Sequence, residues 1–147
     1  MTFSVSIIHR IAAMTGFSII LTFFLSTLFV ELFASTSEIL AVKTFILYAV
    51  WLLIPVMAIT GITGNKMAPN VTSGPIGNKK RRMPFIAMNG LFVLLPCAVY
   101  LQHLAQLGQF DVIFYCVQAV ELLAGFTNLT LMTLNIRDGL KLKRQKK

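Results

Sequence analysis

Four long apolar runs account for most of this chain, and they restrict its fold more than any other feature. Ile11–Val30 and Thr44–Asn65 carry no charge, a third run begins at Pro84, and the fourth, Val112–Ile136, carries one charge, Glu121. A helix needs about 20 apolar residues to cross the roughly 30 Å hydrocarbon core of a bilayer. The first run is longer than the apolar segment of about 7–15 residues in a cleaved signal peptide, so we expect it to remain as a spanning helix.

The composition agrees with a membrane environment. Of the 147 residues, 56% are hydrophobic and only 12% are charged, whereas a soluble domain carries about 25% charged residues. We therefore predict an all-α integral membrane protein that forms one domain, residues 1–147, with the architecture of a four-helix antiparallel bundle. The predicted transmembrane helices are at about 7–33, 39–63, 84–107 and 112–136.

The basic residues predict an orientation. Twelve of the 13 Lys and Arg residues fall near the N-terminus, in the predicted loop 64–83 or in the basic tail 137–147, and only Lys43 lies on the opposite side. Loops rich in Lys and Arg remain in the cytoplasm. We expect a multi-pass protein of the bacterial inner (cytoplasmic) membrane with both termini cytoplasmic.

The net charge of +8 raises the question of nucleic acid as a partner. The basic runs have no interleaved aromatic residues on which bases could stack, so we expect no nucleic-acid binding. Basic segments beside a membrane helix contact anionic lipid head groups instead. The expected partners are the lipid bilayer, those head groups at the loop and tail, and a second copy of the chain or a larger membrane complex.

The fourth helix carries a stripe of polar and small residues at alternating three- and four-residue spacing. Its members are Gln118, Glu121, Gly125, Asn128, Met132 and Asn135. Polar side chains avoid hydrocarbon, so this stripe is expected to face the bundle interior. A carboxylate at the bilayer centre costs about 2.5–3.5 kcal/mol, so Glu121 is expected to hold a proton, hydrogen bonds or both.

The third helix offers a complementary face at regular helical spacing. Its members are Asn89, Pro96, Tyr100 and His103. Matching depths across an antiparallel pair puts Tyr100 near Glu121 and Asn89 near Asn128, while His103 lies closer to the outer surface. The candidates for lining a small polar cavity that binds a proton, an ion or a head group are Glu121, Tyr100, Asn128, Asn89 and His103. The alternative is that they form interhelical hydrogen bonds that only fix the packing.

A short segment at the start of the first helix suggests a different function. Residues 6–13, Ser-Ile-Ile-His-Arg-Ile-Ala-Ala, resemble the segment that opens the first membrane helix of the cytochrome b anchor subunits of succinate dehydrogenases. The resemblance implies that Ser6, His9 and Arg10 line a quinone site, with quinone or haem b as cofactor. The histidine-based haem-ligand motif of that family's second helix has no counterpart here. The alternative is that His9 and Arg10 form an interfacial pair that anchors the helix.

Complete catalytic and metal motifs are missing from the sequence. It contains no HExxH, GxSxG or P-loop pattern, so we nominate no catalytic or metal residue and expect no evident cofactor. The sequence favours a non-catalytic subunit or accessory factor of a membrane complex. Two alternatives remain open: a quinone- or haem-associated electron-transfer subunit, and a small transporter or lipid-binding protein that uses Glu121.

Overall fold

The computed structural model describes residues 2–145, and all of the secondary structure in this range is helical. The elements are α1 (Thr2–Phe33), α2 (Thr36–Met67), α3 (Gly74–Asn89), the π-helical turn η1 (Gly90–Leu94), α4 (Leu95–Gln106) and α5 (Val112–Gln145). Because α3, η1 and α4 follow one another without a break, they form one rod. The predicted all-helical fold with four helices long and apolar enough to span a membrane is confirmed.

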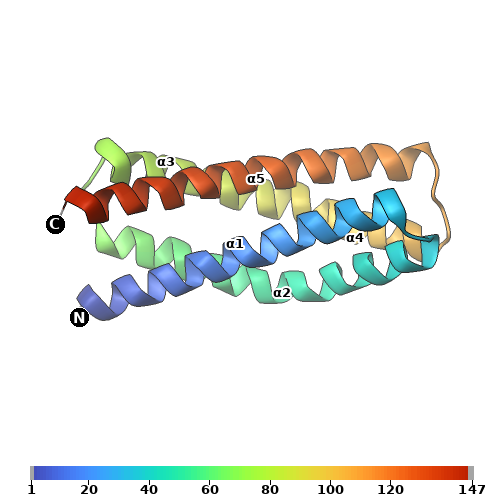
Figure 1. Cartoon of the computed structure of the whole chain (residues 1–147), viewed down its shortest axis with the longest axis horizontal. Coiled ribbons are helices and arrows are strands. Elements are labelled where there is room, and N and C mark those ends of the chain that lie inside the picture. The colour runs from blue at the N-terminus through green and yellow to red at the C-terminus, as the bar shows by residue number, and fades with distance from the viewer. Residues whose placement is uncertain (1, 146–147) are drawn as a thin grey trace.

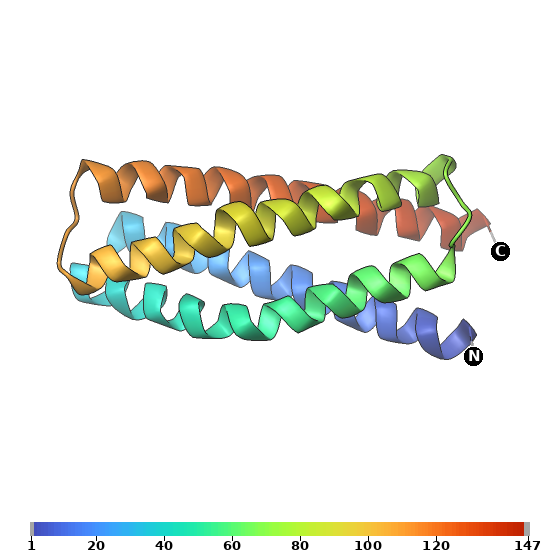
Figure 2. The same cartoon turned by 180° about the vertical axis from the view of Figure 1, so that it is seen from behind.

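The four rods run antiparallel and place both termini at one end of the bundle (Figure 1). We call this end, which also holds the 68–73 connection, the basic end. The opposite end holds the short connections 34–35 and 107–111 and is called the acidic end. The chain therefore consists of two helical hairpins, α1–α2 and α3/α4–α5, as Figure 2 shows from behind.

The connections at the acidic end are fixed by local hydrogen bonds. The Ser35 amide donates to Glu38 Oε2 at 2.8 Å at the start of α2, as in a capping box. Gly108 adopts a positive φ of 70°, which glycine reaches without a steric penalty. Asp111 Oδ1 accepts the Phe114 amide at 3.1 Å, so Asp111 is the N-cap of α5.

The helices extend well beyond the predicted bounds at the basic end. The predicted loop 64–83 is mostly helical, because α2 continues to Met67 and α3 begins at Gly74; Pro84 lies inside α3 rather than in its first turn. Within the tail 137–147, α5 continues to Gln145, and Lys146 and Lys147 lie outside the described residues. A helix satisfies its own backbone, so it need not end where its apolar residues end.

The turn η1 changes which face of the third rod points inward. The Leu95 amide donates to the Gly90 carbonyl, one residue further back than in an α-helix. A turn of this kind accommodates the following Pro96, which has no N–H to donate. One additional residue rotates the rest of the helix by about 100°. The buried positions beyond the turn are therefore Ala98, Leu101, Leu104 and Ala105.

Candidate functional site

A buried ion pair joins the two hairpins in the acidic half of the bundle. Lys43 Nζ on α2 lies 2.5 Å from Glu121 Oε2 on α5, and the lysine side chain is 0% exposed. Gln118 Nε2 donates to the same oxygen at 2.9 Å. Glu121 therefore has the hydrogen-bonded environment that a buried carboxyl group in an apolar helix requires.

The predicted stripe on α5 faces the interior, because all six of its members are buried. Asn128 accepts a hydrogen bond from Asn89 Nδ2 at 2.8 Å and donates from its own Nδ2 to the Ile86 carbonyl at 3.3 Å. Asn89 also donates to the Ala124 carbonyl at 2.8 Å. The structure thus brings Asn89 and Asn128 together, and these bonds join α3 to α5.

Tyr100 and His103 do not join this cluster. Both are exposed on α4, and Tyr100 is 43% exposed. The expected contact between Tyr100 and Glu121 is wrong, because η1 rotates α4 and brings Leu101 to the interior in its place. The partner of Glu121 is Lys43 on α2 and not Tyr100. His103 on α4 lies near the acidic end of the bundle, whereas His9 on α1 lies near the basic end.

His9 joins α1 to α2 within the first hairpin, near the basic end. Its Nδ1 lies 3.1 Å from the Thr60 carbonyl and 3.0 Å from Thr63 Oγ1. These contacts occupy one ring nitrogen and leave Nε2 for another partner. His9 is half-buried, and Arg10 beside it is exposed.

One ion pair and further hydrogen bonds also hold the second hairpin together at the basic end. Arg82 Nη1 on α3 lies 2.7 Å from Asp138 Oδ2 on α5 and donates to Asn135 Oδ1 at 3.3 Å. Lys80 Nζ donates to the Pro69 carbonyl at 2.8 Å. Part of the basic run 79–82 is thus used for packing within the protein.

A cavity of about 1460 Å³ lies between the hairpins and extends from the basic end past the middle of the bundle to Glu121. Arg10, Lys79 and Lys143 line it at the basic end, and Glu121 lines its inner end. The walls between these ends are mostly apolar. The predicted quinone-site residues Ser6, His9 and Arg10 all line this cavity, as do Glu121 and Asn128; their roles in binding stay predictions.

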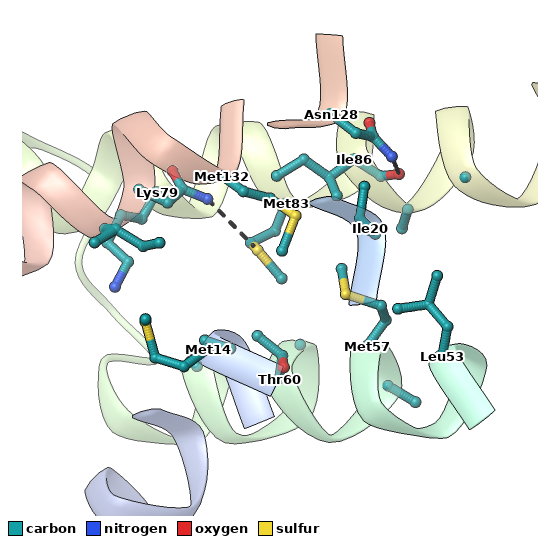
Figure 3. Close-up of a pocket in the computed structure, with 18 of the residues that line it drawn as sticks. Met14, Ile20, Leu53, Met57, Thr60, Lys79, Met83, Ile86, Asn128 and Met132 are labelled. Atoms are coloured by element: carbon teal, nitrogen blue, oxygen red, sulfur yellow. Dashed lines mark hydrogen bonds between the residues drawn. The ribbon is translucent and has the colours of Figure 1, made fainter. Parts of the chain in front are cut away.

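Methionine side chains make up much of the apolar wall. The chain has seven methionines, and five of them line the cavity: Met14, Met57, Met67, Met83 and Met132. Figure 3 shows Met14 and Met57 on the α1–α2 side facing Met83 and Met132 on the α3–α5 side, with Lys79 at one end. Flexible thioether side chains fit irregular and varied apolar ligands, and they are abundant on adaptable binding surfaces.

Sequence reasoning missed two parts of this site. Lys43 was noted only as the one basic residue on the far side, although it lies about as far from the 34–35 connection as Glu121 lies from Asp111. Matching these depths would have paired the two charges. The methionines gave no signal, because a methionine facing a cavity and one facing lipid look the same in a sequence.

Comparison with known proteins adds no family to this description: no protein-family model, curated protein or solved structure matches the chain. Among the described residues, no group of three or more His, Cys, Asp and Glu side chains is placed to hold a metal ion. The function must therefore be argued from the cavity and its lining.

Proposed function

We propose that this chain is a multi-pass protein of the bacterial inner membrane that binds one anionic phospholipid in the cavity between its two hairpins. Both termini and the 68–73 connection lie on the cytoplasmic side, because the basic end carries ten of the eleven Lys and Arg residues that the structure describes. The protein acts without catalysis, as a subunit or accessory factor of a membrane complex that presents or stores this lipid.

The observation that carries the proposal is the polarity of the cavity along its length. Ordinary small-molecule pockets hold about 300–1,000 Å³, and this cavity, at about 1460 Å³, is larger. Cationic side chains stand at one end, and apolar side chains follow toward the inner end. A phosphate head group beside Arg10 and Lys79, with an acyl chain among the methionines, matches both parts.

The cavity begins at the basic end and opens sideways, as the binding of a membrane lipid requires. Its lining includes exposed side chains of α2 and of the α3–η1 segment, among them Ile54 and Leu91. The cavity is therefore open between these two helices toward the surface that faces the acyl chains of the membrane. A lipid could enter sideways and keep its head group at the cytoplasmic interface.

The test is native mass spectrometry of the protein purified in mild detergent and then titrated with phospholipids of either head-group charge. We expect the wild type to retain one anionic phospholipid and to prefer it over a zwitterionic one with the same chains. Basic side chains near a membrane surface contribute about 1 kcal/mol each toward anionic lipid. Arg10→Gln combined with Lys79→Gln should therefore weaken binding by about tenfold or more.

The matched control removes two charges at the same end that do not line the cavity. Lys66 and Arg81 are both exposed and both absent from its lining. Lys66→Gln combined with Arg81→Gln should leave the affinity within about twofold of the wild type. Equal losses in the two double variants, or a wild type that holds no lipid, would reject the proposed function.

One further ligand class has a specific observation in its favour. Ser6, His9 and Arg10, the residues implied by the resemblance to the cytochrome b anchor subunits, converge on the cavity. Arg10 could donate a hydrogen bond to a carbonyl oxygen of a quinone whose isoprenoid tail occupies the apolar wall. His9 Nε2 could accept one from the hydroxyl group of the reduced quinol, because Nδ1 carries the ring proton that bonds the Thr60 carbonyl. A quinone in the organic extract of the purified protein would favour this candidate, and haem would appear as a Soret band.

A further inference from the structure

Three charged side chains lie near one another in the acidic half of the bundle, and the lipid proposed for the cavity does not explain them. Lys43 on α2 and Glu121 on α5 form the buried pair. Glu31, on the last turn of α1, is half-buried and lies close enough for the charges of both to act on its carboxyl group. On α4, Cys97 packs against the core cluster in the same half of the bundle and lies near enough for the charges of Lys43 and Glu121 to act on its thiol.

The charges in this group do not balance. Two carboxylates and one ammonium sum to one negative charge when all three groups are ionised. A charged side chain within a bilayer without a partner costs several kcal/mol, and such groups are found paired or neutralised. One additional positive charge is required to make the group neutral, and a proton is the smallest cation that can supply it.

The hydrogen bonds are incomplete at the same place. Glu31 Oε1 and Gln118 Oε1 are buried and have no hydrogen-bond partner among the described residues. Gln118 is 3% exposed, and its Nε2 donates to Glu121. Buried polar atoms without partners are rare in folded proteins. If Glu31 is protonated on Oε1, this oxygen becomes a hydrogen-bond donor and is no longer an acceptor that lacks a donor.

We propose that Glu31, Lys43 and Glu121 form a proton-binding site in which the two carboxyl groups share one proton. Glu121 lines the inner end of the cavity, whereas Glu31 and Lys43 lie outside its lining, toward the acidic end. The proton can reside on Glu31 while Lys43 pairs with Glu121, or on Glu121 while Lys43 turns to Glu31. The site thus links the cavity wall to the membrane face opposite the basic end, and its proton remains whether or not a lipid is bound.

Infrared spectroscopy of the purified wild-type protein tests this directly, because the C=O stretch of a protonated carboxyl group is separate from the carboxylate bands. The chain has only five Asp and Glu residues, so one protonated carboxyl side chain is detectable. We expect one at neutral pH in the wild type. Glu31→Gln should remove the band, because Glu121 is then ionised beside Lys43, and Glu121→Gln should remove it because Glu31 then pairs with Lys43.

Two further variants keep the result decisive. Glu38→Gln alters an exposed carboxylate at the same end and should leave the band unchanged. Lys43→Met removes the only cation of the group and should increase the band about twofold, because both carboxyl groups then need protons. Glu31→Gln and Glu121→Gln are both expected to lose the band. If only one of them keeps its helical circular dichroism spectrum, that variant alone tests the proposal. A wild type without the band, or a band that survives in a folded single variant, overturns the proposal.

Discussion

The two halves of the bundle are built from the same four rods, yet one is filled and the other is hollow. In the acidic half, Leu101 and Phe114 are fully buried in a core cluster beside the Lys43–Glu121 pair. Through the basic half and as far as Glu121, the hairpins leave the cavity of about 1460 Å³ between them. The turn η1 lies between the two halves.

The difference shows what each half is able to do. An ion pair in a dry interior tolerates little separation of its helices, because each charge left alone would be strongly destabilising. The Lys43–Glu121 pair therefore holds the hairpins together at one end. At the other end, His9 and Arg82 bond within their own hairpins, and the hairpins stand apart there around the cavity in which we propose that the lipid binds.

Removing the cation from the filled half should have the largest effect. Lys43→Met leaves Glu121 buried without its partner and should destabilise the protein by about 3–5 kcal/mol. Lys79→Met at the hollow end should change the stability by about 0.5 kcal/mol or less, because Lys79 makes no ion pair with the described residues. Thermal unfolding in detergent, followed by circular dichroism, measures both.

The same comparison can be sharpened with a double variant. Lys43→Met combined with Glu121→Leu replaces both charges by apolar groups, and such replacements are often neutral or stabilising. We expect the double variant to regain most of the stability lost in Lys43→Met. If it is as unstable as the single variant, the lysine acts through its size and not through its charge.

Deletions test the role of η1 as the boundary between the halves. Deleting Phe92, which faces outward from the turn, together with Pro96→Ala should convert the π turn to an α-helix and preserve the inward face of α4. Deleting Val99 with the same Pro96→Ala should rotate the rest of α4 by about 100° and bury the wrong residues. The first variant should fold with a melting temperature a few degrees from the wild type, and the second should not fold. Equal behaviour would show that the turn does not set the register.

Substitutions in the methionine wall should have the smallest effect on stability. Met57→Leu and Met83→Leu nearly conserve volume, so each should cost less than about 1.5 kcal/mol. The stiffer leucines should narrow the range of acyl chain lengths that bind, which titration with lipids of different length measures. The control is Met88→Leu, because Met88 is exposed and absent from the cavity lining; an equal narrowing there would contradict the role of the wall.

The periodicity of α5 was sufficient to predict its interior face from the sequence, because that helix is regular along its length. The same reasoning was correct for Asn89 and wrong for Tyr100, since these two residues lie on opposite sides of η1. Pro96 is a visible cause of irregularity, but a proline can kink, end or widen a helix, and only the packing decides which. Regular spacing therefore predicts a face only as far as the next irregular turn.

The site could be predicted only in part. Glu121 and Asn128 were evident because polar residues in an apolar helix demand partners. Its partner Lys43 is on the other hairpin. Predicting this pair would have required matching the depths of the two residues, counted from the acidic end. The cavity itself results from how far the hairpins diverge at the basic end, and no local sequence pattern encodes that distance.

The most direct test of the central claim is to fill the cavity without changing its charges. Gly61 lines the cavity, and a Cβ atom added there would meet no other heavy atom within 4 Å, so Gly61→Phe is chosen to place a ring in the hollow. Ile59→Phe on the outward face of the same helix is the matched control. Native mass spectrometry should show that Gly61→Phe loses the bound phospholipid while its melting temperature stays at or above that of the wild type, and that Ile59→Phe keeps the lipid. A Gly61→Phe protein that binds the lipid as the wild type does would contradict the account.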